Sequence, residues 1–588
     1  SVLADKFDTK VTVGSVNLGF FNRIIIDDVM MYDQKGDSMI YASRISAKVS
    51  LLPLLNQKIS IASAQLFGLK ANLYQQTPQS KHNFQFVLDS LASKDTTKHT
   101  PLDLHIGSLI IRHGAVKYDK RYIVSKSGVF SPAHISISDL STHIIANHIT
   151  DDAINLHIKK LAFRDKSGLQ LNSLSFKLDA NKREASLKEF ELQLPHSDIT
   201  LGDIHATYKF DNGKLVMPTL QYSGSIEQSK ITLSDIACLL PIFRHFEDAV
   251  FFETQFTGTS TSLRCQKINF KTGSGSINLQ AKGRISDWNS RPAWDVDIAN
   301  LNLTEESISF ISHNLGKKIN VPKEVTRLGG IHYVGHLSGH GDRLSSKGRL
   351  ETGAGNADIQ LSKNGKNIQA KIATKGIALD RILANKAFGQ VATTIEVKGN
   401  KDHLVAKGEI SRFDYNKYSF RNISLDGQCN HGIVKGLASI DDPNIRVDIE
   451  GNYAIKGNKY AINTHIDHLQ PSILGVKMAD KDYSLDDIDL SANNQSSDSY
   501  LDLEAPFMSL HARGQYNLST LVSSIQNMIA EKLPTLPGIK KTKAKGDNDF
   551  TLQGNIYSTE VLNKILGIPL AISSPIHING NISEQSNE

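Results

Sequence analysis

Apolar and polar residues alternate along most of this chain, and short segments of helical spacing interrupt the alternation. In the segment WDVDIANLNL, for example, Val296 and Ile298 are separated by one polar residue. A period of two gives a β-strand one apolar face and one polar face. Sustained over hundreds of residues, it predicts a mainly β protein with one very long, half-apolar sheet. The residues expected on the apolar face are Leu174, Phe176, Leu178, Val296, Ile298, Ile359, Leu361, Ile395, Val397, Ile445, Val447, Ile449, Leu501 and Leu503.

Turn dipeptides between the alternating runs predict tight hairpins, which make neighbouring strands antiparallel. Three are of the Asn-Gly type, at 212–213, 364–365 and 579–580. Gly-Asn dipeptides stand in similar places at 399–400, 451–452, 457–458 and 554–555. A parallel β-helix would need a regular rung period, which is not found in this sequence. We therefore expect an antiparallel sheet.

Short amphipathic helices are predicted at five places, starting near Ser234, Thr304, Leu379, Asn517 and Ser558. The first would run over 234–247, although Pro241 limits or kinks it. Three of the five end in an apolar residue followed by glycine, which commonly stops a helix in the left-handed conformation. These glycines are Gly316, Gly389 and Gly567. One more helical stretch is expected around 86–91, and polar linkers are expected at 75–80, 93–100, 493–499 and 539–548.

Composition adds few constraints. Lysine and arginine total 66 against 60 acidic residues, and this well-mixed net charge of +6 does not by itself indicate nucleic-acid binding. The odd number of cysteines argues against a disulfide framework. A bridge between Cys238 and Cys265 stays open in an oxidising compartment, and buried free thiols are the alternative. No apolar run approaches the ~18 residues that span a bilayer. Both ends of the chain look cut, so an upstream signal or anchor stays open.

No constellation of residues in the sequence indicates an enzyme. His332, His336 and His340 share strand parity, but Asp342 is the one carboxylate beside them, which is too little for a metal site. The Gly-x-Gly pairs at 273–275 and 353–355 do not complete a phosphate-binding loop. Neither a nucleophile elbow nor a Ser-His-Asp set is found. We expect no catalytic residues, no metal and no cofactor.

The first part of the chain carries the most specific motifs. The segments IIIDDVMMYD and SMIYASRISAKVS precede a Leu-Leu-Pro-Leu-Leu turn, and KISIASAQLFGLKANLY and LDLHIGSLIIRHGAVKYD follow it. In this order, residues 1–120 resemble the N-terminal module of the AsmA-like family and, within that family, its TamB branch. The later segment GIALDRILANKAFGQVATTIEVKG resembles the interior repeats of the same branch.

The resemblance implies an elongated, twisted antiparallel sheet folded into a taco-like trough with an apolar interior. Members of this family are anchored in the inner membrane of double-membraned bacteria, reach across the periplasm and are implicated in phospholipid transport. The TamB branch also acts in outer-membrane protein assembly, in the translocation and assembly module. The implied partners are phospholipids, the inner membrane through a missing N-terminal anchor, and an outer-membrane barrel protein through a missing C-terminal domain. Nucleic acid is not an expected partner.

The predicted organisation has four parts. Residues 1–120 form the AsmA-like N-terminal β module, and 121–303 form a β-trough segment with a helix near 234–247. Residues 304–516 form β-trough repeats, each opened by a short helix. Residues 517–588 form a helix-containing β-trough segment that is truncated at its C-terminus.

An apolar trough suits phospholipid transport on physical grounds. Two ~16-carbon acyl chains expose roughly 28–30 methylenes, so moving them from membrane to water costs on the order of 20 kcal/mol. A trough lined by the residues named above would remove that cost, although each of them could instead pack against a neighbouring sheet or helix. The alternative function is a scaffold or chaperone for outer-membrane β-barrel assembly, whose sheet edge pairs with client strands without lipid transport. A third class, a secreted adhesin or carbohydrate binder, is disfavoured because the chain has only two tryptophans.

Overall fold

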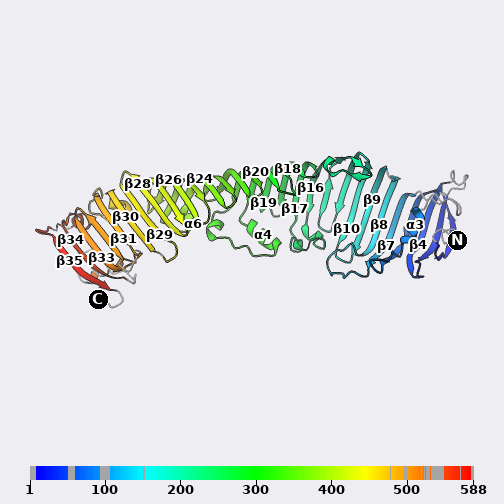
Figure 1. The fold of residues 1–588 in the computed structure, drawn as a ribbon, viewed down its shortest axis with the longest axis horizontal. Helices are drawn as coiled ribbons and strands as arrows, with labels where there is room; N and C mark the ends of the chain where they lie inside the picture. The colour runs from blue at the N-terminus through cyan, green and yellow to red at the C-terminus, as the bar shows by residue number, and fades with distance from the viewer. Residues whose placement is uncertain are drawn as a thin grey trace. The chain divides into compact units, whose positions relative to one another are not determined.

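The computed structural model is mainly β and divides into two compact units, Ser1–Asn320 (unit 1) and Val321–Glu588 (unit 2) (Figure 1). It describes residues 8–20, 22–50, 60–92, 106–149, 152–457, 459–476, 478–495, 499–517, 520, 521, 523, 524, 527, 530, 531, 548–567, 569 and 571–583. The Leu-Leu-Pro-Leu-Leu turn and the linker at 93–100 lie outside these residues. The linkers at 493–499 and 539–548 are described only in part.

Unit 1 is an elongated sheet in which most strands pair antiparallel with the next strand along the chain. Its strands are β1 (Val11–Thr12), β2 (Ser15–Gly19), β3 (Arg23–Tyr32), β4 (Ser38–Ser50), β5 (Ser60–Phe67), β6 (Lys70–Gln75), β7 (Ile106–Lys120), β8 (His134–Ile149), β9 (Ala153–Asp165), β10 (Gln170–Asn181), β11 (Glu184–Gln193), β12 (Asp198–Leu201), β13 (Ile204–Thr207), β14 (Phe210–Asp211), β15 (Lys214–Leu215), β16 (Gln221–Ile231), β17 (Val250–Thr259), β18 (Ser262–Thr272), β19 (Ile277–Ser286) and β20 (Ala293–Leu303). Its short helices are α3 (Gln85–Ala92), η1 (Met217–Thr219), η2 (Leu233–Ile236), η3 (Pro241–Phe243) and α4 (Ser307–Leu315).

Unit 2 repeats this arrangement, and each described strand from β22 on pairs antiparallel with the strand before it. Its strands are β21 (Ile331–His340), β22 (Arg343–Thr352), β23 (Gly355–Asn364), β24 (Asn367–Ala378), β25 (Phe388–Gly399), β26 (His403–Tyr415), β27 (Tyr418–Asn430), β28 (Ile433–Asp442), β29 (Ile445–Ala454), β30 (Lys459–Leu469), β31 (Leu485–Asn493), β32 (Tyr500–Ala505), β33 (Met508–Gln515), β34 (Asp549–Ile556) and β35 (Ile576–Ser583). The short helices are α5 (Lys323–Thr326), α6 (Leu379–Leu383), η4 (Pro471–Leu474) and α8 (Glu560–Leu566).

The prediction of a purely antiparallel sheet is wrong at one place. β5 and β6 form one line that is broken at Gly68, and both pair in parallel with β7, as in the partners Ile61 and Ile106. Parallel neighbours need a crossover rather than a tight turn. The chain between Gln75 and Ile106, which contains α3, provides that crossover.

The turn dipeptides mark real hairpins at four of the seven predicted places. Asn212 and Gly213 join β14 to β15 with positive φ angles of 47° and 72°, and hairpins also form near Gly365, Gly399 and Gly457. The prediction is wrong for Gly451, Gly554 and Gly580, which lie inside β29, β34 and β35.

These three strand glycines lie on the apolar side of the sheet, where each pairs with a large residue, Leu552 in the case of Gly580. Gly451 pairs with Ile462, and Gly554 pairs with Leu510. A Cβ on Gly451 would approach the Ala461 carbonyl oxygen to 2.8 Å, so glycine gives room to the adjacent strand here. Glycine therefore occurs both in hairpin turns and inside strands, where it leaves space for the adjacent strand.

We expect Gly451→Val to lower the free energy of unfolding by about 2 kcal/mol because its side chain is forced against the backbone of β30. Gly580→Val is the matched control, since a Cβ there would meet no atom within 4 Å. Urea unfolding followed by circular dichroism measures both. Equal stability of the two variants would contradict this reading of Gly451.

Two of the three glycine helix stops are confirmed. Gly316 ends α4 and Gly567 ends α8, with φ angles of 61° and 68°. The third stop is wrong, because α6 ends at Ala384, which is itself left-handed at φ 53°. Gly389 instead is the second residue of strand β25.

The structure replaces the predicted helix over 234–247 by two short 3₁₀ turns, η2 and η3. Pro241 starts η3 and cannot donate the backbone hydrogen bond that a continuous helix would need at this position. The helix around 86–91 is confirmed as α3. The helix predicted after Asn517 lies largely outside the described residues, although Thr520 and Leu521 are helical.

Three buried aspartates stabilise hairpin ends. Asp33, Asp165 and Asp442 each accept a hydrogen bond from the backbone N–H two residues later, at 2.8–3.0 Å. Each also accepts a second backbone N–H, and Asp33 and Asp442 accept a tyrosine hydroxyl as well. Because the acceptors are buried, these bonds fix the hairpin conformation and the register of the strands beside it.

Candidate functional site

The strand register of unit 2 gathers its apolar residues on one face. Ile359 pairs with Ile372, and Ile372 pairs with Ile395. Followed strand by strand to β35, this row consists of Ile359, Ile372, Ile395, Gly408, Leu425, Ala438, Ile449, Thr464, Leu490, Leu503, Leu510, Gly554 and Ile578. The row carries no charged side chain.

A second row runs beside the first on the same face. It consists of Leu361, Ala370, Val397, Ala406, Gly427, Gly436, Gly451, Ile462, Ala492, Leu501, Ala512, Leu552 and Gly580. Ile445 and Val447 share the face with Ile449, because they precede it by four and two residues on β29. All the unit 2 residues predicted for the apolar face therefore lie on it.

The unit 1 residues predicted for the apolar face also share one side of their sheet. Leu174 pairs with Leu192, Leu178 pairs with Leu187, and the ring of Phe176 stacks on Phe190 with centroids 6.2 Å apart. The register continues this face through Leu201, Ile226, Thr254 and Ile268 to Ala281, which pairs with Ile298. Val296 lies on the same face, opposite Gly283.

This face is only partly shielded from water. Of the predicted residues, Ile298, Ile445 and Val447 are buried, and the others remain partly exposed. On the same face Ile372 is 42% exposed and Leu425 is 37% exposed. Soluble proteins rarely leave a long contiguous apolar surface open unless it binds something.

The apolar face of unit 2 is covered locally at two places. Ile473 of η4 packs against the buried cluster of Phe420, Ile423, Ile445 and Val447. Farther along, Leu521 packs in a cluster with Ala512, Phe550 and Ile582, against which Leu501 also lies. The helical segments therefore shield parts of the face and leave the strands between these places open.

Several residues of the apolar face were not singled out from the sequence. Ile372, Leu425, Ile440 and Leu490 occupy it as fully as their predicted neighbours. The same alternation with a period of two marks these residues in the sequence. In each strand, however, a glycine, alanine or threonine on the same face shortens the run of large apolar side chains.

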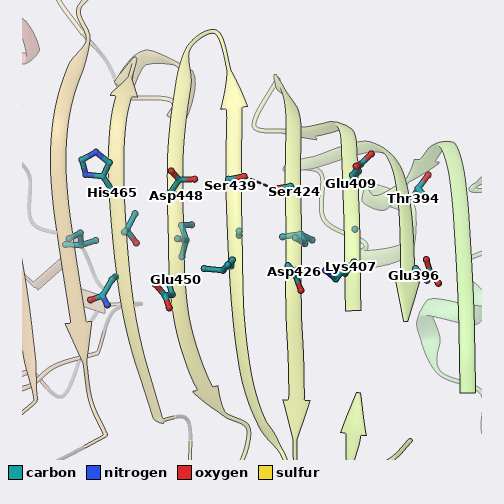
Figure 2. A pocket seen from close by; sticks show the side chains of 18 of the residues that line it. Thr394, Glu396, Lys407, Glu409, Ser424, Asp426, Ser439, Asp448, Glu450 and His465 are labelled. Carbon is teal, nitrogen blue, oxygen red and sulfur yellow. Dashed lines mark hydrogen bonds and ion pairs between the residues drawn. The ribbon is translucent and has the colours of Figure 1, made fainter. Parts of the chain in front are cut away.

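The opposite, polar face of unit 2 carries a hollow of about 860 Å³ (Figure 2). The residues that line it belong to three neighbouring rows. The middle row belongs to the apolar face, and the side chains of the two flanking rows point to the opposite, polar side of the sheet. The hollow therefore lies on the polar face, with the backbone of the middle row as its floor. One polar row is Thr394, Glu409, Ser424, Ser439, Asp448, His465 and Asp489, and the other is Lys371, Glu396, Lys407, Asp426, Leu437, Glu450, Asn463 and Ser491.

Cross-strand pairs organise the charges of this hollow. Lys407 Nζ lies 2.8 Å from Asp426, which raises the pKa of the lysine, and Ser424 and Ser439 share a hydrogen bond of 2.6 Å. Lys398 and Gln369 lower the pKa of Glu396 through hydrogen bonds. The hollow is rich in carboxylates, and its printed pairs link neighbouring strands within a row, as in Lys407 with Asp426 and His465 with Asp489.

His465 is the titratable group of this hollow whose charge changes near neutral pH. Its Nδ1 lies 2.7 Å from Asp489 and its Nε2 lies 3.2 Å from Asp467. The hydrogen bond to Asp489 raises the pKa of His465. The stabilisation from this pair is therefore fully present below the unfolded pKa of about 6.5 and is lost as the pH rises through the folded pKa.

We expect an NMR titration to place the pKa of His465 above the ordinary histidine value of about 6.5, and Asp489→Asn to bring it down. A pKa of His465 that stays the same in Asp489→Asn would contradict the cross-strand pairing.

The remaining candidate residues from the sequence are placed as follows. Cys238, Cys265 and Cys429 are free thiols, and burial raises the pKa of Cys238. His332 lies 3.3 Å from Glu351 on the neighbouring strand, whereas His340 is paired with Arg343 in the register. Within the described ranges, no group of three or more histidine, cysteine or acidic side chains is placed to hold a metal ion.

No family model and no curated protein matches this chain. Among the residues that the structure describes, no helix combines the length and the apolar character needed to cross a membrane. The geometry of the two faces is therefore what carries a functional argument.

Proposed function

We propose that the apolar face is the floor of a trough that carries phospholipid between the inner and outer membranes of a double-membraned bacterium. One observation carries the proposal: rows of apolar side chains continue from strand to strand within each unit and remain partly open to solvent. Acyl chains lying along such rows would stay out of water, at ~0.8 kcal/mol for each methylene, while the headgroup stays in solvent.

The contacts available on this face suit a sliding cargo. The rows alternate large side chains with small ones, as in Ile395, Gly408 and Leu425, and contain no charged group that would fix a headgroup. Threonine is their most polar residue, at Thr464. Nonspecific apolar contacts of this kind bind many acyl chains weakly, which lets a lipid move from one strand to the next.

The resemblance to the AsmA-like family supports the location and the partners in this proposal. Proteins of that family are implied to lie in the periplasm, attached to the inner membrane, and to work with an outer-membrane barrel protein in outer-membrane biogenesis. These features belong to the proposal and rest on residues 1–120 and on the repeated pattern of strands and short helices.

Native mass spectrometry of the purified chain, with parallel lipid extraction, tests this function. We expect several phospholipid molecules for each chain, because the open face of each unit is long enough for more than one. A chain that carries no phospholipid, even after incubation with detergent-solubilised lipid, would overturn the proposal and favour the scaffold.

A further inference from the structure

The polar face of the unit 1 sheet carries a hollow of about 870 Å³, which extends over β13 and β16–β20. Arg264 of β18 and Arg284 of β19 line it and are direct partners in the register, so both guanidinium groups leave the same face of the sheet. Their sequence neighbours Leu263 and Ile285 also pair with each other, and their side chains point to the apolar face. The hollow therefore holds two adjacent cations on the side of the sheet opposite to the apolar rows.

This arginine pair has no counterion among the residues that the structure describes. Like charges directly opposite each other on adjacent strands destabilise a sheet. Neither guanidinium group makes a hydrogen bond or an ion pair with a described residue. Asp295 is the one carboxylate among the described residues of the lining, and it lies beside Arg284 in the register, on the side away from Arg264. No ion pair joins Asp295 to Arg284, so the repulsion between the two arginines is not offset by a direct contact.

A second cross-strand arginine pair shows how the chain offsets the same repulsion elsewhere. Arg412 and Arg421 are register partners on β26 and β27 of unit 2. Asp414, two residues along the strand from Arg412, accepts two hydrogen bonds from the Arg412 guanidinium group, at 2.9 and 2.8 Å. None of the residues at that spacing from Arg264 or Arg284 is acidic. The pair in the hollow therefore lacks the internal carboxylate that the pair in unit 2 has.

Hydroxyl groups lie beside the two arginines on the same face. Thr257 is the register partner of Arg264 on β17, and Ser262 and Ser286 each lie two residues along the strand from one of the arginines. The Thr257 Oγ1 accepts a hydrogen bond from the Gln266 side chain at 3.1 Å, and its own hydroxyl hydrogen can still be donated. Three neighbouring strands thus offer guanidinium and hydroxyl donors to one place.

We propose that this hollow binds the phosphate group of a soluble phosphorylated compound. A phosphate monoester carries a charge of about −1.5 to −2 at neutral pH and three strong acceptor oxygens, which suits two guanidinium groups with hydroxyls beside them. A carboxylate offers one charge and two oxygens, which is enough for one guanidinium group. A phospholipid headgroup bound here could not keep its acyl chains on the apolar face, because that face lies on the other side of the sheet. The proposal does not depend on lipid carriage.

Phosphorus NMR line broadening of glycerol 3-phosphate, titrated with the full chain, tests this site. We expect saturable binding by the wild-type chain and an affinity at least about tenfold lower for Arg264→Gln. Arg264→Lys keeps the charge but loses the planar fork, so its affinity should lie between the two. Arg421→Gln is the matched control, because it removes one arginine from the pair that already has Asp414, and it should bind as the wild-type chain does.

Hydrogen exchange of the β18 and β19 amides is a second readout. Without ligand, Arg264→Gln should exchange more slowly than the wild-type chain because it removes the repulsion, and glycerol 3-phosphate should slow exchange in the wild-type chain. Faster exchange in Arg264→Gln would show that the arginine serves the sheet itself and would overturn the site.

Three further outcomes would also overturn it: no saturable binding by the wild-type chain, wild-type affinity in Arg264→Gln, or equal weakening in Arg421→Gln. Dihexanoyl phosphatidic acid supplies the same phosphate on a short-chain lipid. Binding of this lipid about tenfold tighter than that of glycerol 3-phosphate would identify a lipid headgroup as the occupant and overturn the soluble ligand.

Discussion

Ile359→Asp is expected to slow phospholipid transfer by about tenfold or more, because it places one charge in the apolar row of unit 2. Ile359 lies between Gly348 and Ile372 in the register, and an acyl chain that follows the row has to pass the new carboxylate. Fluorescent phospholipid moving from donor to acceptor vesicles measures the transfer rate.

The next residue along the same strand is the control for this prediction. Gln360→Asp places the same charge on the opposite face, between Lys347 and Lys371, where it gains favourable partners. We expect wild-type transfer from Gln360→Asp. If both variants transfer lipid at the wild-type rate, the apolar face is not the path of the lipid, and a scaffold that works through its strand edges becomes the better explanation.

Asp442→Ala is expected to cost unit 2 about 3 to 5 kcal/mol of local stability. Asp442 is 2% exposed and accepts hydrogen bonds from the backbone N–H groups of Arg421 and Asn444 and from the Tyr418 hydroxyl. Alanine leaves all three donors near the end of the β28–β29 hairpin without their acceptor. Native-state hydrogen exchange of the β27–β29 amides, read by mass spectrometry, measures the loss.

Two further variants separate this mechanism from a general effect of removing charge. Asp441→Ala removes an exposed carboxylate from the adjacent position and should change local stability by no more than about 0.5 kcal/mol. Tyr418→Phe removes one of the three donors and should cost about 1 kcal/mol. An Asp442→Ala variant that exchanges like Asp441→Ala would show that the buried bonds contribute little.

The fold class and the apolar face could be predicted from the sequence because both follow from local alternation. Ile395 and Val397 define their own face without knowledge of any other strand, since a period of two needs only one strand. The alignment of one strand with the next cannot be predicted from a single strand. That Ile395 lies beside Ile372 and Gly408 depends on pairing, so the continuous rows and the polar hollow emerged only with the register.

The wrong predictions about glycine share a physical cause, which is that one residue type serves two purposes. Glycine stops α4 at Gly316 but gives room to a neighbouring strand at Gly451. Ala384 adopts the left-handed stop that was expected of Gly389. The parallel line of β5 and β6 on β7 depends on a crossover of about thirty residues, a distance over which alternation carries no information.

The nearly sequential strand order has a mechanical consequence. When tension is applied through the two ends of unit 2, each antiparallel strand can peel from its neighbour one hydrogen-bonded pair at a time, so the sheet should lengthen in small steps at low force. The parallel pairing of β5 and β6 with β7 responds differently to tension. The start of β5 and the end of β7 lie at opposite ends of the paired strands, so tension between them loads all the hydrogen bonds between the strands at once. Unit 1 therefore contains one rigid clamp within an otherwise extensible series of hairpins.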